Sequence, residues 1–351
     1  MRKDLAYLEL CAQRAREGHL GVWRQLAEMA LLYVRHGVGP GYYQMAGFFR
    51  RDVAWKDKTL QLSAAQYRRR VNALNPLVYR KISQHKIPEK AVLSLFSIPT
   101  PRFLGRLQAR NGRDHAGRAL QSAADLEALV RRYGLSKLVF KQPEGHGGKG
   151  VQIARVEHDE PMRCGAINAS TLVPLVEYCE STLHLPEGEE WLVEEHFTQH
   201  PTVAAINPSS VNTVRIWVVD RGEAGMQVLL AYLRIGRGHM FVDNASSGGI
   251  VAPIDMATGR LRPAQDAHAK RQLYARHPDH GAAIEGVLLP CWAEVQDVAK
   301  RALAAFPLLR FAGLDVAIGP DGPVVLELNV SPDREAAAFT GCPTVEALPN
   351  H

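Results

Sequence analysis

The last third of the chain contains a sequence that predicts a β-hairpin. Two apolar segments, residues 313–318 and 324–329, flank the turn sequence Gly-Pro-Asp-Gly-Pro at 319–323. Glycine and proline between two such segments are typical of a tight chain reversal. If the turn is centred on its aspartate, Asp315 and Glu327 are equidistant from the centre and should face each other across the two strands.

Asn329 lies two residues after Glu327 and should point to the same face of the hairpin. Two like charges that face each other cost stability unless something neutralises them. Carboxylate and amide oxygens are hard ligands that suit Mg²⁺, which takes one or two carboxylates and leaves other positions for water and phosphate oxygens. The alternative is an edge hairpin with solvated acids. Because valine and leucine flank Glu327, we expect a buried strand, and we predict Asp315, Glu327 and Asn329 as metal ligands.

The composition is that of an ordinary globular protein, with 351 residues, 46% hydrophobic and 22% charged. This length allows two domains. No segment approaches the roughly 18 to 20 apolar residues that span a bilayer, and the N-terminus lacks an apolar leader, so we expect a cytoplasmic protein. The five cysteines are odd in number and form no C-x-x-C pair, which argues against a disulfide framework or a zinc site.

The net charge is +6, and basic residues concentrate in the first third of the chain. No aromatic-interleaved basic motif or recognition-helix pattern accompanies them, so a nucleic-acid partner is not expected. A solvated basic face, or one that attracts an anionic small molecule or polymer, is the favoured interpretation.

The order of predicted elements indicates an α+β fold rather than regular βαβ alternation. Helical periodicity dominates residues 3–75, with a glycine-rich break at 36–41. Further helices are predicted over 89–96, 122–133 and 290–306. Strands are predicted over 137–142, 151–156, 191–197, 211–219, 227–235 and 249–254.

A glycine-rich loop at residues 145–150 lies between two predicted strands. Its backbone amides can approach an anion closely. It is not a Walker A loop, because glycine follows its lysine and a strand rather than a helix comes next. Lys141 ends the preceding apolar strand, where a buried ammonium group needs a partner such as a phosphate. A plain flexible hairpin is the alternative to this phosphate-binding flap.

Three other segments place polar residues in apolar surroundings. Residues 191–197 form an apolar strand ending in paired acids, whose backbone could meet an adenine edge, although this pattern alone is weak. Arg215 and Arg234 lie on apolar strands and should each pair with an anion, from the protein or from a ligand. The loop at 243–249, with Asn244, could line a substrate pocket or be an ordinary turn.

In this order, the motifs resemble the ATP-grasp superfamily: a lysine-bearing strand, a glycine flap, a strand ending in acids, an arginine strand, an Asn-x-x-x-Gly-Gly loop and a terminal Asp…Glu-x-Asn hairpin. The sequences at 199–201, 210–215 and 331–332 are most similar to its sugar-transfer-associated branch, near the α-L-glutamate ligase-like enzymes. The resemblance covers about 76–340. It implies an ATP-grasp fold in which two α+β subdomains, about 76–200 with the flap and about 201–345 with the metal ligands, clamp ATP. Residues 1–75 would be an N-terminal helical extension.

The resemblance also implies a role for each motif. Lys141 and Lys86 would contact ATP, with Lys90 as the less favoured alternative to Lys86. The flap would close over the phosphates through Gly145, His146, Gly147, Gly148 and Gly150. Adenine would be held, largely by backbone groups, at Glu194, Glu195, His196 and Phe197. Asp315, Glu327 and Asn329 would bind two Mg²⁺ ions, for which Mn²⁺ is an expected substitute. The catalytic residues would be Arg215, Arg234 and Asn244, which steady the γ-phosphoryl group and the acyl phosphate formed from it.

The activity implied by the resemblance is that of a carboxylate–amine ligase. ATP would phosphorylate a small-molecule carboxylate and an amine would attack the acyl phosphate, attaching an amino acid or similar group to a sugar-linked intermediate of exopolysaccharide assembly. Two departures concern the substrates: Val242 stands where glutamate-ligase-like relatives carry arginine, and the first third is helical where many ligases have a small α/β domain. The alternatives are a kinase that phosphorylates a hydroxyl group, with His146 as a conceivable phosphoryl acceptor, and a non-catalytic nucleotide-binding protein.

Overall fold

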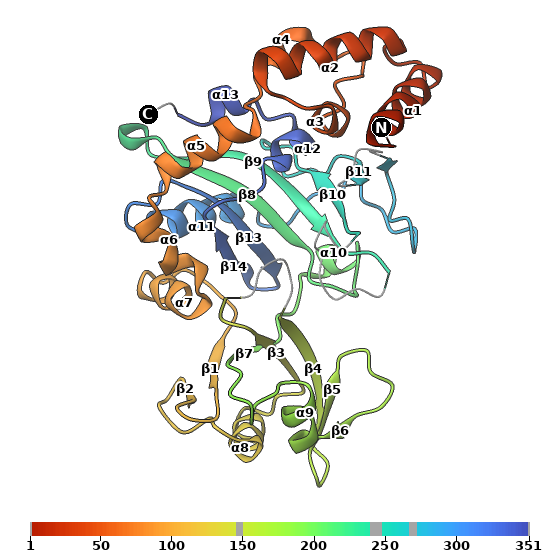
Figure 1. The fold of residues 1–351 in the computed structure, drawn as a ribbon. Coiled ribbons are helices and arrows are strands. Elements are labelled where there is room, and N and C mark those ends of the chain that lie inside the picture. Colours follow the sequence, from red (N-terminus) through yellow and green to blue (C-terminus); the bar gives the residue numbers. More distant parts are fainter. Residues whose placement is uncertain (1, 145–149, 239–247, 267–271, 350–351) are drawn as a thin grey trace. The chain divides into compact units, whose positions relative to one another are not determined.

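The computed structural model describes residues 2–144, 150–238, 248–266 and 272–349. The chain divides into two compact units (Figure 1). One unit combines residues 1–81 with residues 199–351, and the other consists of residues 82–198. Each unit contains a seven-stranded sheet of its own, and every strand pair is antiparallel.

Sheet A belongs to the unit of residues 82–198 and has the strand order β2-β1-β7-β3-β4-β5-β6. Its strands are β1 (Phe103–Leu107), β2 (Arg113–Asp114), β3 (Lys137–Lys141), β4 (Val151–Glu157), β5 (Arg163–Ala166), β6 (Val173–Pro174) and β7 (Trp191–Glu195). The helices are α7 (Lys86–Leu95), α8 (Ala123–Tyr133) and α9 (Leu175–Ser181), and α6 (Leu77–Gln84) spans the boundary with the other unit.

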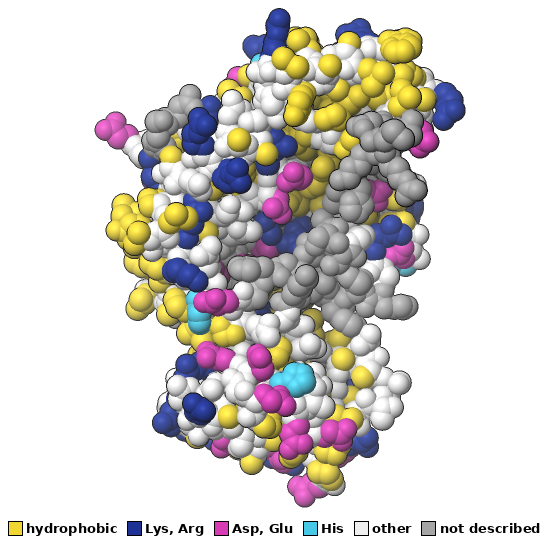
Figure 2. All heavy atoms as spheres, in the orientation of Figure 1, with side chains coloured by type: hydrophobic (Ala, Val, Ile, Leu, Met, Phe, Trp, Pro, Cys, Tyr) yellow, Lys and Arg dark blue, Asp and Glu magenta, His cyan; other side chains and the backbone are white. Residues whose placement is uncertain are grey.

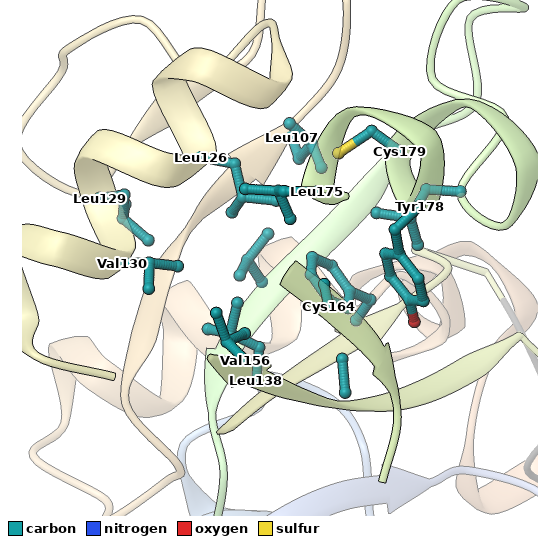
Figure 3. Close-up of a cluster of buried hydrophobic side chains, with 14 of the residues drawn as sticks. Leu107, Leu126, Leu129, Val130, Leu138, Val156, Cys164, Leu175, Tyr178 and Cys179 are labelled. Carbon is teal, nitrogen blue, oxygen red and sulfur yellow. The ribbon is translucent and has the colours of Figure 1, made fainter. Parts of the chain in front are cut away.

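The hydrophobic core of this unit lies on one face of sheet A, under α8 and α9 (Figure 3). Leu138 and Phe140 of β3 are fully buried there with Leu126 of α8 and Tyr178 of α9. Side chains alternate along a strand, so Lys141 lies on the opposite face of the sheet. The polar end of β3 is thereby kept out of the core.

Sheet B belongs to the other unit and has the order β12-β11-β10-β9-β8-β13-β14. Its strands are β8 (Thr213–Asp220), β9 (Met226–Ile235), β10 (Ile250–Pro253), β11 (Ala264–Asp266), β12 (Leu273–Tyr274), β13 (Phe311–Gly319) and β14 (Gly322–Asn329). The helices of this unit, apart from α6, are α1 (Arg2–Arg16), α2 (Val22–His36), α3 (Pro40–Met45), α4 (Trp55–Thr59), α5 (Ala64–Leu74), α10 (Pro201–Ala204), the short 3₁₀ helix η1 (Gly222–Ala224), α11 (Trp292–Ala304), α12 (Glu335–Thr340) and α13 (Thr344–Ala347).

The two faces of sheet B are covered by different helices. On one face, α5 and α12 enclose a cluster that includes Trp217 and Phe311. Tyr67 of α5 stacks on Trp217, with ring centroids 5.8 Å apart. Helix α11 packs against β8, β9, β13 and β14 without joining this cluster, and so covers the other face. Arg215 and Asp315 lie on the first face, beyond its apolar part, because Arg215 is two residues before Trp217 and Asp315 is four residues after Phe311.

The N-terminal helices are tied to sheet B by polar contacts as well as by packing. The buried side chain of Asn75, which follows α5, donates to the carbonyls of Phe311 and Val330 and accepts from the amides of Arg310 and Phe311. Helices α1 to α3 have a core of their own, which includes Leu32 and Tyr43 and takes in Ala338 of α12.

The predicted elements are present, with ends shifted by a few residues. The helix predicted over 122–133 is α8, and the Ser122 hydroxyl caps its N-terminus by accepting from the Asp125 amide. The short strands β1, β2, β5, β6, β11 and β12 were not predicted. The expected solvated basic face is wrong for Arg70 and Arg80, since Arg70 donates to the carbonyls of Val345 and Leu348 and Arg80 is buried against Asn75. Among the described residues, no helix is long and apolar enough to cross a membrane.

Candidate functional site

In the unit of residues 82–198, one buried acid binds two lysines. Glu194 of β7 is 2% exposed, and its two carboxylate oxygens lie 2.7 Å from Lys90 Nζ and 2.7 Å from Lys141 Nζ. Lys90 reaches this position from α7 and also donates to the carbonyl of Pro101 at 2.8 Å. All three charged groups lie on the face of sheet A that is not covered by α8 and α9. The cluster therefore carries one more positive than negative charge.

The electrostatics of this cluster favour an additional anion. Burial alone would raise the pKa of Glu194, but the ammonium groups of Lys141 and Lys90 outweigh it and hold this pKa below its usual value. Burial lowers the pKa of Lys90, and Glu194 offsets this only partly because Lys141 shares the same carboxylate. The acid is thus held ionised, while the charge of Lys90 is offset only in part by Glu194 and, more weakly, by Glu89. A phosphate oxygen at this position would complete the pairing.

The first predicted lysine, Lys86, lies one turn before Lys90 on the same helix. It begins α7, and its backbone amide donates to the carbonyl of Pro143 at 3.0 Å. The lysine that contacts Glu194 beside Lys141 is thus Lys90, the less favoured of the two candidates for ATP contact in the sequence analysis. The spacing i, i+4 on one helix is the signal that both lysines lie on one side of α7.

Most of the predicted flap lies outside the described residues, as do Gly145, His146, Gly147, Gly148 and Asn244. Gly150, at the far end of the flap, is described. Its φ is +75°, and a Cβ there would lie 2.3 Å from Gln142 Oε1. The Gly150 carbonyl accepts from the Gln142 amide at 2.8 Å. Glycine is required here for the strands β3 and β4 to close toward each other at the base of the loop.

The segment predicted to hold adenine begins at the end of β7. Glu195 is the last residue of the strand, and its amide donates to the carbonyl of Arg102. His196 and Phe197 follow the strand, and among the described residues no backbone hydrogen bond uses their amide or carbonyl groups. The side chain of Glu194 makes the contacts described above, and the adenine contact of its backbone stays a prediction.

In the other unit, the predicted terminal hairpin is formed by β13 and β14, and Asp315 pairs directly with Glu327. The turn is one residue tighter than predicted, because Gly319 pairs with Gly322. Leu326 is left unpaired, which shifts the register of the two strands by one residue. Beyond Leu326, the strands therefore pair as predicted. Asn329 pairs with Gly313, so it lies on the same face as the two acids.

Asp315 pairs with two arginines in the structure, which the like-charge argument did not include. Its Oδ1 lies 2.5 Å from Arg215 Nε, and its Oδ2 lies 3.0 Å from Arg215 Nη2 and 2.8 Å from Arg234 Nη1. Burial would raise the pKa of Asp315, but the two guanidinium groups outweigh it and lower this pKa. The expectation that Arg215 and Arg234 each pair with an anion is confirmed, and the anion is the same one.

Glu327 and Asn329 retain oxygen atoms that can bind a metal. The strand that carries them is the edge of sheet B and is only half-buried, so the expectation of a buried strand is wrong. Among the described residues, none donates a hydrogen bond to the Glu327 carboxylate or forms an ion pair with it. Asn329 Oδ1 accepts only from the amide of Ser331. A free carboxylate, an oriented amide oxygen and the remaining lone pair of Asp315 fit the hard-oxygen preference of Mg²⁺. No three His, Cys, Asp or Glu side chains gather into a metal site within the described ranges, so phosphate oxygens or water would have to complete the shell.

A cavity of about 500 Å³ lies in the same unit, lined by residues of β10 and β11, by α12 and by the segment after α3. Pro253 in its wall pairs with Tyr232, which pairs with Arg215. Gln265, also in the wall, pairs with Val251, which pairs with Arg234. Neighbouring strands are about 4.8 Å apart, so the backbone of these wall residues lies roughly 10 Å from that of the two arginines. Phe48 and Phe339 supply apolar surface, and Arg50 and Asp57 supply charges of both signs.

The chain belongs to the sugar-transfer-associated ATP-grasp family, whose family model matches residues 63–340. This membership confirms the predicted ATP-grasp fold, an α+β fold with two antiparallel sheets. The ATP-grasp superfamily includes ATP-dependent carboxylate–amine ligases, so the predicted enzyme class is confirmed at the level of the superfamily. Helices α1 to α4 precede the matched residues.

Similar solved structures include several ligases of low sequence identity. The D-alanine–D-alanine ligase from Coxiella burnetii is 13% identical, with a TM-score of 0.39, over 74% of this chain and 49% of that chain. The D-alanine–D-alanine ligase from Bacillus anthracis in complex with ATP is 15% identical, with a TM-score of 0.42, over 78% of this chain and 67% of that one. D-Cycloserine synthetase is 14% identical, with a TM-score of 0.43, over 88% and 92%. The chain spans about half the length of the first of these structures. A comparison with curated proteins found no match.

Proposed function

We propose that this protein is an ATP-dependent carboxylate–amine ligase that acts through an acyl-phosphate intermediate. The observation that carries the proposal is the pairing, on one face of sheet B, of two buried arginines with Asp315, beside the unpaired carboxylate of Glu327. Such a set supplies both fixed cations for a transferring phosphoryl group and oxygen ligands for its metal. Family membership supports the same class of reaction.

Arg215 and Arg234 would stabilise the negative charge of the transferring group. The γ-phosphoryl of ATP passes to a carboxylate oxygen of the substrate, giving an acyl phosphate and ADP. The nitrogen of an amine then attacks the acyl carbon, phosphate leaves, and the amine loses a proton. Because both arginines are fixed by Asp315, they need little reorganisation when charge develops near them. The reaction requires no nucleophile from the protein, so positioning supplies much of the rate.

Lys141 and Lys90 are proposed to bind nucleotide phosphate, with Lys90 in place of Lys86. The excess positive charge around Glu194 supports this assignment. The flap with Gly145, His146, Gly147, Gly148 and Gly150 is proposed to cover the phosphates. The segment of Glu194, Glu195, His196 and Phe197 is proposed to bind adenine, largely through its backbone. Asn244 is proposed to assist the two arginines.

Asp315, Glu327 and Asn329 are proposed to hold Mg²⁺, as one or two ions, with Mn²⁺ as a substitute. When bound, the metal would neutralise charge on the phosphates. Because two guanidinium groups already contact Asp315, a cation alone would be repelled there, and we expect it to bind together with the nucleotide.

The cavity near Pro253 and Gln265 is proposed to hold one of the two substrates. Its volume suits a small molecule, and its lining offers apolar surface together with charged groups of both signs. A sugar-linked substrate of exopolysaccharide assembly is part of the proposal and is supported by the description of the family. A cytoplasmic location, where ATP is abundant, belongs to the same proposal.

The test is incubation of the full chain with Mg-ATP, candidate carboxylates and hydroxylamine. A ligase should release ADP and form a hydroxamate from the acyl phosphate. ADP release with a phosphorylated alcohol and no hydroxamate would show a kinase instead, and ATP binding without turnover of any candidate would favour a non-catalytic protein.

A variant pair sharpens this test. Glu327→Ala should abolish turnover, because it removes the unpaired carboxylate beside Asp315. Glu285→Ala, which removes an exposed acid of the same unit, serves as the control and should keep full activity. Unchanged activity in Glu327→Ala would refute its metal role.

A further inference from the structure

Helix α2 exposes an apolar surface where a helix at the edge of a protein normally exposes polar residues. Trp23 is 83% exposed and Val34 is 82% exposed. Together with the other exposed residues of α2, they form a set without any acid or any uncharged amide: Trp23, Arg24, Ala27, Ala30, Leu31, Tyr33, Val34 and Arg35. Figure 2 shows hydrophobic side chains gathered on the outside of the N-terminal helices. Six of these eight exposed residues are apolar, whereas the exposed face of a surface helix is usually polar.

The exposed apolar residues fall on one stripe of the helix. At 3.6 residues per turn, Trp23, Ala27, Ala30, Leu31 and Val34 lie within about 100° of one another. Arg24 and Arg35 lie together along one border of this stripe, and Tyr33 lies along the other. The stripe runs roughly 16 Å along the helix axis, from Trp23 to Val34.

Polar contacts on the inner face hold the stripe outward. Gln25 is fully buried, and its Nε2 donates to the carbonyls of Cys11 and Leu20. Glu28 accepts from Tyr43 Oη at 2.9 Å and from Lys58 Nζ at 2.6 Å, where Lys58 is 1% exposed. Rotating α2 to bury its apolar stripe would leave these groups without partners, which is costly. The exposure of the stripe is therefore built into the fold.

We propose that the outer face of α2 docks on an anionic membrane surface. A helix that presents an apolar stripe with tryptophan and tyrosine, bordered by arginines, lies in the interface of a bilayer with its apolar face inserted among the headgroups. Arg35 complements the negative charge of anionic headgroups, and Arg24, whose Nε also lies 3.2 Å from Glu28 Oε1, adds to it. A second copy of the chain fits less well, because a twofold contact through this face would bring arginines together with no acid of the face to pair with them. The proposal does not depend on the proposed ligase activity.

The test is flotation of the full chain with vesicles of equimolar phosphatidylcholine and phosphatidylglycerol, compared with pure phosphatidylcholine. Binding to the anionic vesicles should be roughly tenfold tighter or more and should weaken with added salt. The double variant Trp23→Gln, Val34→Gln should lose roughly tenfold or more of this affinity. Its control is Leu77→Gln, Val78→Gln, which replaces an exposed apolar pair of α6 and should bind as the parent does.

Charge is tested separately. Arg35→Glu should weaken binding to anionic vesicles by more than Arg68→Glu, which makes the same charge change at an exposed position of α5. Circular dichroism and thermal unfolding establish that each variant is folded. Three results would overturn the proposal: no binding of the folded parent to anionic vesicles, equal binding by the Trp23, Val34 variant, or a dimer in sedimentation that this variant dissociates.

Discussion

Each unit of the molecule contains a buried acid held between two cations, and the two clusters differ in the kind of cation. In sheet A, Glu194 binds Lys90 and Lys141. In sheet B, Asp315 binds Arg215 and Arg234. Lysine is a compact charge that loses its proton when burial disfavours the charged form, whereas arginine stays charged and binds a carboxylate through a planar fork.

The difference separates a cluster that can adjust its charge from one that cannot. Burial lowers the pKa of Lys90, so this cluster can lose a proton when its surroundings change. Arg215 responds in the opposite direction: burial would lower its pKa, but Asp315 outweighs this and raises it. We infer that the lysine cluster tolerates arrival and departure of a ligand anion, while the arginine cluster keeps a fixed geometry.

The largest expected effect is on stability. Asp315→Asn removes the acid that Arg215 and Arg234 both contact and should lower the free energy of unfolding by about 3–5 kcal/mol. Glu194→Gln should cost less, about 1–3 kcal/mol, because Lys90 can release its proton. Chemical denaturation of the two variants measures both changes. A larger loss in Glu194→Gln would contradict the distinction between the clusters.

The next effect concerns nucleotide affinity. Lys90→Ala and Lys141→Ala should each weaken ATP binding by roughly 10- to 100-fold, as expected for a lost charge-assisted hydrogen bond. Lys86→Ala, on the same helix, is the matched comparison and should have a smaller effect. Isothermal titration with ATP gives the ranking, and a Lys86 variant weaker than the Lys90 variant would restore the original assignment from sequence.

A smaller effect on folding stability is expected at acidic pH. The folded-state pKa values of Glu194 and Asp315 lie below their usual values of 4.5 and 3.8. Their contribution to stability is therefore complete above these values and is lost as the pH falls through the lower folded-state pKa. Glu194→Gln should reduce the loss of stability at the higher-pH end of this range, and Asp315→Asn should reduce it at the lower-pH end. Denaturation measured from neutral pH to below pH 3.8 tests this, and identical pH profiles for all three proteins would exclude both acids as the cause.

The smallest effect is a change of ATP affinity and stability at alkaline pH, and it should come from the lysine cluster alone. Lys90 releases its proton below the usual lysine value of 10.5, so its contribution to ATP affinity should be lost at lower pH than for an ordinary lysine. Its contribution to folding stability changes the other way: the unfolded chain binds more protons in this window, so stability rises with pH. Lys90→Arg should keep ATP affinity constant over the same range. A parent profile as flat as that of Lys90→Arg would rule out a titrating Lys90.

The sequence predicted the residues of the arginine cluster well because strand alternation and pairing fix which side chains share a face. Arg215, Arg234 and Asp315 were each identified, yet their mutual pairing was not, since it depends on which strands are neighbours in the sheet. Strand order is a long-range property: β8 and β13 pair across about 100 residues of sequence. The like-charge argument missed these ion pairs for the same reason, because it considered one hairpin without the arginine strand beside it.

The lysine cluster was harder to predict because one of its members comes from a helix. Residues four apart on a helix point in nearly the same direction, so choosing between Lys86 and Lys90 requires knowing which turn of α7 lies beside Glu194. The short strands β5, β6, β11 and β12 were missed because two to four residues hold too few alternations to define a period. Helix α2 could not be fully oriented from its hydrophobic pattern, because the fold buries Gln25 and Glu28 beside its apolar core residues and exposes Trp23 and Val34.

The unpaired Leu326 in β14 lets the hairpin change length at two places without changing which residues pair. Residues added at the tip, between Gly319 and Gly322, would lengthen a turn and leave the strands beyond it in place. Deleting Leu326 would remove the irregularity, and Glu327 would still face Asp315 because Val325 already pairs with Val316. Deleting Leu328 would instead turn Asn329 to the other face of the hairpin. Related sequences should therefore vary in length at the tip and at position 326, and keep one residue between Glu327 and Asn329.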